Sequence, residues 1–376
     1  MAGSKETIVL GRALAGIGGG GCNSISTFIT SDFIPLRRRG TWHGMAMVMY
    51  GSGVGLGGVI GGIVNESWGW RWAFFALTPF TVLSGLGVTF FLPARASLKE
   101  QSLVSRLRRI DFSGSFALVS ALVLFLIGLN QEDPNTASSH LILEFVMPLA
   151  AASVIIFVSI ELYCAREPII PINLLGNRTV SGACVASWFV SMAVYTLMFY
   201  VPLYFQLRGY NTSETGVRLL PEAIGGAIGS FSAGVVMRLT GRYGILKMFV
   251  LAVFIAGNAG FATVSMSTPF FLSEVYLFLN GLGLGGILTV MLLALLSSVK
   301  HEQQAVTTSI LYAFRSTGSS IGISVSSAVF RRLLKIRLGE VAAPGSCTIS
   351  PGQVTWMTCS VDASTLTGTA KMIVPI

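Results

Sequence analysis

Residues 271–298 read FLSEVYLFLNGLGLGGILTVMLLALLSS, and no charged side chain follows Glu274 within this stretch. A helix of about 20 apolar residues spans the roughly 30 Å hydrocarbon core of a bilayer. Similar stretches recur along the chain, which is 52% hydrophobic and 11% charged, whereas soluble domains carry about 25% charged residues. The sequence therefore predicts an all-α polytopic membrane protein. This composition excludes a soluble multidomain enzyme, a disordered chain and a disulfide scaffold.

Ten stretches of this kind are candidate spans, at about 8–30, 44–65, 72–92, 112–129, 141–163, 180–206, 216–237, 246–266, 271–298 and 304–330. Membrane strands are about 10 residues long and alternate in polarity, and these runs do not alternate. Lys and Arg gather in the loops on one side of the series, which is therefore predicted to be cytoplasmic. The basic residues of 331–337 fall on the opposite side, against this rule.

The first candidate span contains Gly11-Arg12-Ala-Leu-Ala-Gly16-Ile-Gly18, which places a cation one turn inside an apolar helix. A charge inside a membrane helix costs about 3 kcal/mol on insertion scales and usually faces a partner or an aqueous cavity. The alternative is that Arg12 extends its side chain to the nearby helix end.

The second candidate span contains Gly51-Ser-Gly53-Val-Gly55-Leu-Gly57-Gly58-Val-Ile-Gly61-Gly62. Glycines four residues apart leave a bare helix face, which predicts close packing against a neighbouring helix. Trp68-Gly-Trp70-Arg71-Trp72 follows this run and is typical of an aromatic belt at the membrane–water boundary.

In this order and spacing, these elements resemble the fourth to sixth spans of the major facilitator superfamily, in its 14-span drug:proton antiporter branch. The Arg-x-x-x-Gly-x-Gly element resembles that family's motif B, at Arg12, Gly16 and Gly18. The glycine run resembles the antiporter motif C, at Gly57, Gly58, Gly61 and Gly62. Gly58 takes the place of a proline, so the kink of a helix-interior proline is lost. A later segment, with Gly234, Arg238, Gly241 and Arg242, resembles a degenerate second copy of the family's motif A. In this segment Arg238 stands where an Asp is expected.

The resemblance covers about residues 5–338 and implies that the chain holds spans 4–13 of the family, without its first three and last spans. It implies an N-terminal half reduced to three spans (1–93), a basic linker with two extra spans (94–165) and a C-terminal half of five spans (166–338). Residues 339–376 are then a non-spanning tail, interpreted as foreign to the family. The strings at 166–171 and 312–322 are most similar to fungal vacuolar basic amino-acid permeases.

Transporters of this superfamily bind substrate near the bilayer midplane between two halves, so deep polar residues are the candidates for the transport path. Arg315 lies about 11 residues into its span, which is roughly 16 Å at 1.5 Å per residue. Glu222 lies one turn inside its span, four residues after Arg218. It is either a protonatable site that couples proton flow to transport or the i,i+4 partner of Arg218. Glu274 is expected at the interface.

Five polar residues complete the set of candidates. Tyr200, Tyr204 and Gln206 share a span end and either line a cavity or belong to an aromatic belt. Asn258 and Asn280 are single mid-span amides, for which interhelical hydrogen bonding is the expected role and the transport path the alternative.

The resemblance implies proton-coupled antiport of a small solute, with basic amino acids entering the fungal vacuole as the favoured substrates. Multidrug or xenobiotic efflux at the plasma membrane is the alternative, and a truncated, non-transporting membrane fragment is an alternative of another class. The expected partners are the solute, protons and the bilayer. No cofactor, metal, nucleotide or nucleic acid is expected, because 16–21 lacks the Lys-Ser/Thr of a P-loop and the three histidines are scattered. An enzyme is not expected.

Overall fold

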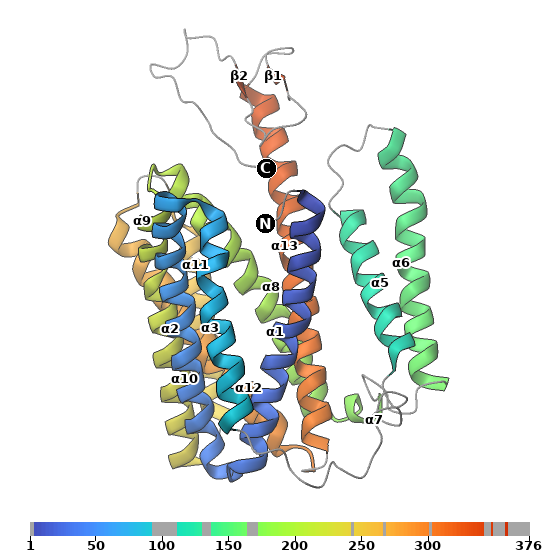
Figure 1. Cartoon of the computed structure of the whole chain (residues 1–376), viewed down its shortest axis with the longest axis vertical. Helices are drawn as coiled ribbons and strands as arrows, with labels where there is room; N and C mark the ends of the chain where they lie inside the picture. The colour runs from blue at the N-terminus through green and yellow to red at the C-terminus, as the bar shows by residue number, and fades with distance from the viewer. Residues whose placement is uncertain are drawn as a thin grey trace.

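The computed structural model describes residues 4–91, 111–129, 137–163, 172–241, 244–265, 268–300, 303–341, 347–348 and 358–359. Within these ranges the regular secondary structure is helical except for one antiparallel pair of two-residue strands, β1 (Cys347–Thr348) and β2 (Thr358–Cys359). The predicted all-α fold is therefore confirmed (Figure 1). Most of the tail after residue 341 lies outside the described part of the chain.

Three long helices open the chain and two more follow as a hairpin. The first five helices are α1 (Lys5–Phe33), α2 (Leu36–Trp68), α3 (Trp70–Phe91), α5 (Phe112–Leu129) and α6 (Ala137–Tyr163). The remaining helices are α7 (Ile172–Leu175), α8 (Arg178–Leu207), α9 (Thr212–Arg218), α10 (Leu220–Thr240), α11 (Gly244–Ala262), α12 (Phe270–Ser297) and α13 (Gln304–Val341).

By length and composition, eight helical segments of the described chain can cross a membrane. They lie in α2, α3, α5, α6, α8, the continuous α9–α10 stretch, α11 and α12. α1 and α13 occupy the other two predicted spans and are long enough, at 29 and 38 residues. Glycines in α1 and serines, threonines and basic residues in α13 make these two less apolar than the eight.

Local sequence explains where several helices begin and end. Ser4 caps α1, since its hydroxyl accepts a hydrogen bond from the Thr7 backbone N–H at 3.4 Å. α2 ends at Gly69, whose φ of 88° lets the chain turn directly into α3. α10 ends at Gly241, which has a left-handed φ of 64°.

The packed part of the molecule is built on glycine contacts between neighbouring helices (Figure 1). α2 runs against α9 and α10 from the contact of Gly40 with Gly234 to the contact of Gly62 with Ser213. α10 meets α12 equally closely, because a Cβ added at Gly229 would collide with the Leu282 backbone. Small residues at such positions let helix backbones approach and gain dispersion contacts that larger side chains would prevent.

Described residues beside three of the connections predicted to be cytoplasmic, α1–α2, α7–α8 and α12–α13, lie at one end of this bundle. At that end Arg39 contacts Gln304, and Asn177 Nδ2 donates to the Ser298 carbonyl at 3.4 Å. At the other end Glu66 Oε2 accepts from the Ser213 hydroxyl at 2.8 Å. The assignment of the first end to the cytoplasm stays a prediction.

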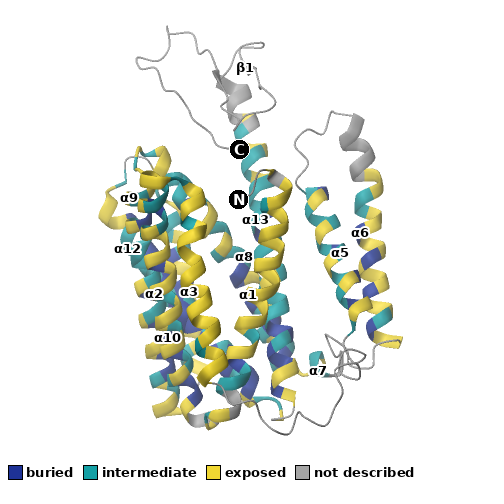
Figure 2. Cartoon of the chain, viewed as in Figure 1, coloured by how far each residue is buried: buried dark blue, intermediate teal, exposed yellow. Residues whose placement is uncertain are grey.

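Large apolar side chains cover the outer faces of α1 and α3, where Figure 2 shows mostly exposed residues. Leu14, Ile17 and Phe80, for example, are 72%, 76% and 74% exposed. Exposed apolar surface on this scale is unfavourable in water and suits contact with lipid or with other membrane helices.

Candidate functional site

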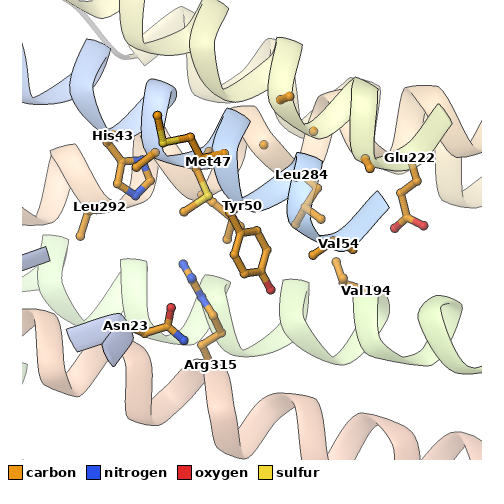
Figure 3. A pocket seen from close by; sticks show the side chains of 18 of the residues that line it. Asn23, His43, Met47, Tyr50, Val54, Val194, Glu222, Leu284, Leu292 and Arg315 are labelled. Carbon is orange, nitrogen blue, oxygen red and sulfur yellow. The ribbon is translucent and has the colours of Figure 1, made fainter. Parts of the chain in front are cut away.

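A cavity of about 670 Å³ lies among α1, α2, α8, α10, α12 and α13 (Figure 3). Its walls are mostly apolar, which is usual for small-molecule sites that use a few polar groups for orientation. It is lined by helices from before and after the α5–α6 hairpin, as expected of a site between two halves. Among its described lining residues, the polar or ionisable ones are Asn23, Ser26, Thr27, Thr30, Arg39, His43, Tyr50, Ser191, Tyr195, Glu222, Tyr312 and Arg315.

Arg315 projects from α13 into this cavity toward Tyr50 of α2 (Figure 3). Its guanidinium carbon lies 5.1 Å from the centre of the Tyr312 ring, a cation–π distance. The Nε atom is shielded from solvent and has no hydrogen-bond partner in the described structure. Arg315, which the sequence predicted to lie deep in its span, is thus on the cavity wall, and its Nε–H is available to hydrogen-bond a ligand.

Glu222 lies on α10 and lines the same cavity, separated from Arg315 by apolar side chains (Figure 3). The i,i+4 pair that the sequence allowed with Arg218 is absent between these two described residues. Arg218 Nη1 instead binds Glu274 Oε1 at 2.8 Å, and its guanidinium lies 4.1 Å from the Tyr210 ring centre. Glu274 is therefore half of an ion pair, and the Glu222 carboxylate stays available to the cavity.

A buried polar contact joins α2 and α13 at the cavity wall. Arg39 is 7% exposed, and its Nη1 donates to Gln304 Oε1 at 2.7 Å. Gln304 Nε2 in turn donates to the Leu296 carbonyl at 3.0 Å. Close by, the Thr27 hydroxyl of α1 is 2.9 Å from the Tyr312 hydroxyl. These bonds join the N-terminal helices to the C-terminal ones.

Gln304→Leu is expected to lower the free energy of unfolding by about 3 kcal/mol, because it removes the acceptor of a buried guanidinium and the donor to a buried carbonyl. Thermal unfolding of the protein in detergent measures this change. Gln303→Leu is the matched control, since the Gln303 side chain is exposed. Equal melting temperatures for the two variants would contradict the assigned role.

A second polar chain passes from the cavity wall into the helix packing. His43 Nδ1 lies 3.4 Å from the Thr289 hydroxyl, and Thr289 shares a hydrogen bond with Ser230. Both hydroxyl-bearing residues are fully buried. The chain fixes the His43 ring where α2, α10 and α12 meet.

The other predicted candidates lie away from the cavity. The Arg12 guanidinium is on an exposed helix, 4.9 Å from the Phe74 ring centre. Tyr200 stacks on Phe330 at 5.2 Å between ring centres. The Tyr204 hydroxyl donates to the Ser265 carbonyl at 3.2 Å.

The three remaining candidates are also absent from the cavity wall. Gln206 is exposed. Asn258 Nδ2 donates to the Phe254 carbonyl of its own helix at 2.8 Å, so its hydrogen bond is not interhelical. Asn280 is fully buried, with neither amide atom hydrogen-bonded in the described structure. The expected interhelical hydrogen bonds of the two asparagines are therefore not formed.

The glycine motifs divide between packed and open positions. Gly58 and Gly62 face α9, where a Cβ at Gly62 would lie 2.7 Å from the Ser213 Cα, whereas Gly57 and Gly61 have open space around them. Gly16 and Gly18 of the motif B-like element are open as well. The packing face of α2 therefore contains four glycines of the predicted run, Gly51, Gly55, Gly58 and Gly62, together with the earlier Gly40 and Gly44.

In the motif A-like segment, Gly234 packs on the Gly40 backbone. Arg238 is exposed and Gly241 forms the helix cap. Arg242 lies outside the described residues.

The sequence reasoning missed the cavity face of α2. Arg39, His43, Met47, Tyr50 and Val54 all line the cavity and follow one another at three- or four-residue intervals. That spacing places them on one helix face, beside the glycine face. The helical spacing of Arg39, His43 and Tyr50 near the glycine run is the sequence signal for this face.

Comparisons with known proteins agree with this architecture. The sequence profile described as Major Facilitator Superfamily matches residues 1–323. A multidrug resistance protein of Schizosaccharomyces pombe is 34% identical over 90% of this chain and 64% of its own length. A vacuolar membrane amino acid uptake transporter of the same organism is 32% identical over 88% of this chain and 57% of its own length.

A vacuolar basic amino acid transporter of Saccharomyces cerevisiae is 30% identical over 85% of this chain and 69% of its own length. This chain thus spans 64% and 57% of the two Schizosaccharomyces pombe relatives. The names of these relatives include both amino-acid transport and drug resistance.

Proposed function

This chain belongs to the major facilitator superfamily, and we propose that it works as a proton-coupled antiporter of a small solute. It is an integral membrane protein of a transporter family, and its relatives are named as transporters or resistance proteins rather than as enzymes. The observation that carries the proposal is Glu222, a carboxylate on the wall of a cavity that is lined by helices from before and after the α5–α6 hairpin. Arg218 is occupied by Glu274, so Glu222 is free to bind and release a proton.

Proton binding at Glu222 gives the cavity two charge states. A carboxylate in a largely apolar cavity is costly when charged, and protonation removes that cost. A bundle that rocks around the site then exposes the neutral or the charged form to one side at a time. The energy for transport comes from the proton gradient.

The favoured solute is a basic amino acid, moved into the fungal vacuole. Two relatives support this substrate and this membrane, since their names specify vacuolar amino acid uptake and vacuolar basic amino acid transport. Efflux of xenobiotics across the plasma membrane is the second candidate, favoured by the relative named as a multidrug resistance protein and by the mostly apolar walls of the cavity.

Vesicles containing the protein, with an acidic lumen, are expected to accumulate radiolabelled arginine, and a protonophore is expected to abolish the accumulation. Unlabelled lysine should compete with the label, whereas azoles and cationic dyes should not. Competition by azoles or dyes alone would favour the second candidate. If neither class of solute moves in response to the gradient, the proposal of proton-coupled antiport by this chain is wrong.

A further inference from the structure

The charges on the cavity wall are unbalanced. Of the three charged side chains among its described lining residues, Arg39 and Arg315 are cationic and Glu222 is anionic. Arg39 is engaged by Gln304 Oε1 at 2.7 Å and by the Ile34 carbonyl at 2.8 Å. Arg315 has no hydrogen bond or ion pair in the described structure. Arg315 is therefore the cation on the described cavity wall whose Nε–H donor has no partner in the described structure.

The groups around Arg315 are donors and rings rather than acids. The phenol groups of Tyr312, Tyr195 and Tyr50 lie close enough to interact with the charge of Arg315. The His43 ring does so as well. No carboxylate belongs to this set of described neighbours. Tyr50 and Tyr195 line the cavity and form no hydrogen bond in the described structure, so their hydroxyls are also free to donate.

A planar guanidinium beside free phenol hydroxyls is suited to one kind of ligand group. Guanidinium offers parallel N–H donors that match the two oxygens of a carboxylate, and such charge-assisted pairs are stronger than neutral hydrogen bonds. A cation within a membrane protein normally has a partner of opposite charge. The described residues supply no partner of opposite charge for Arg315. The transported solute can therefore take the place of that partner.

We propose that Arg315, together with the hydroxyls of Tyr50 and Tyr195, binds the carboxylate of the transported solute. The proposal rests on the proposed transport function and narrows its substrate class to carboxylate-bearing solutes. Val54, Val194 and Leu284 lie between Arg315 and Glu222 in the cavity (Figure 3). These apolar side chains suit the aliphatic stem of an amino acid whose carboxylate is held at Arg315.

The test compares arginine with agmatine, which is arginine without its carboxyl group, by displacement of radiolabelled arginine from the purified protein without a gradient. The wild-type protein is expected to bind arginine about 10- to 100-fold more tightly than agmatine, the range expected for one charge-assisted pair. Arg315→Gln should remove this difference by weakening arginine binding alone. Arg315→Lys should restore part of the difference, because it keeps the charge without the planar fork.

Arg71→Gln is the matched control, since Arg71 is exposed on α3 and lies over the Trp70 ring at 4.5 Å. It should bind both ligands as the wild-type protein does. Equal affinities of the wild-type protein for arginine and agmatine would overturn the proposal. So would an Arg315→Gln variant that loses affinity for both ligands alike, because that result indicates a structural role.

A second ligand pair separates failure of this inference from failure of the amino-acid proposal. A carboxylate dye and its methyl ester are compared by their own binding to the same protein. If neither arginine nor agmatine binds but the carboxylate dye binds better than its ester, the assignment of Arg315 stands and the amino-acid proposal fails. Equal binding of the two dyes, preference for the ester, or no binding of any of the four ligands overturns the assignment.

Discussion

Glu222→Gln is expected to reduce proton-driven uptake to the level of vesicles without the protein. Glutamine keeps the size and most of the polarity of the side chain but neither gains nor loses a proton. A cycle that requires Glu222 to be charged on one side of the membrane and neutral on the other therefore stops. The measurement is radiolabelled arginine uptake into vesicles with and without an imposed pH gradient.

Exchange of labelled for unlabelled solute without a gradient distinguishes coupling from collapse of the fold. The Glu222→Gln variant should still exchange solute. In exchange the carrier has solute bound in both directions across the membrane, so no net proton movement is needed. Glu144→Gln, on the exposed surface of α6, is the matched control and should keep gradient-driven uptake. Gradient-driven uptake of wild-type size by Glu222→Gln would remove Glu222 from the coupling mechanism.

Gly229→Ala is expected to lower the free energy of unfolding by about 3 kcal/mol, which is at the upper end for overpacking a well-packed site. The added Cβ would collide with the Leu282 carbonyl of α12, and its distance to the Leu282 Cα would be 2.9 Å. Both contacts are backbone atoms, so neither can move aside by a change of rotamer. The two helices must separate along their shared face, and the dispersion contacts between them weaken.

Thermal unfolding in detergent, followed by size-exclusion chromatography, measures the loss. Gly57→Ala makes the same chemical change on α2, where nothing lies within 4 Å of the added Cβ. It should leave the melting temperature unchanged or raise it, because alanine has the higher helix propensity by about 1 kcal/mol. Similar melting temperatures for the two variants would show that the contact of α10 with α12 is not tight.

The glycine motifs show how far local sequence reasoning extends. The i,i+4 spacing correctly predicts that α2 has a close-packing face, because that spacing follows from helix geometry alone. It does not determine which set of glycines meets a neighbour. Gly53, Gly57 and Gly61 have the same spacing as Gly58 and Gly62 yet face open space. The choice depends on the position of α9 and α10, about 150 residues later in the chain.

For the candidate site too, local sequence predicted some residues correctly and others not. Arg315 and Glu222 were found because a charge inside an apolar run is costly wherever the helix lies, and this cost can be read from one segment. Tyr200, Tyr204 and Gln206 were selected by the same polar criterion, but none of the three is on the described cavity wall. The sequence around these residues does not show how their helix is rotated about its axis.

Local sequence is enough to predict the all-α membrane class, the approximate spans and two of the ionisable residues on the cavity wall, Glu222 and Arg315. Each of these follows from hydrophobicity or charge within one segment. Helix packing, by contrast, sets the pairing of Arg218 with Glu274, the burial of Arg39 against Gln304 and the position of Arg315 among described tyrosines. These facts depend on which helix faces meet across long sequence separations, and that is fixed by packing of the whole bundle.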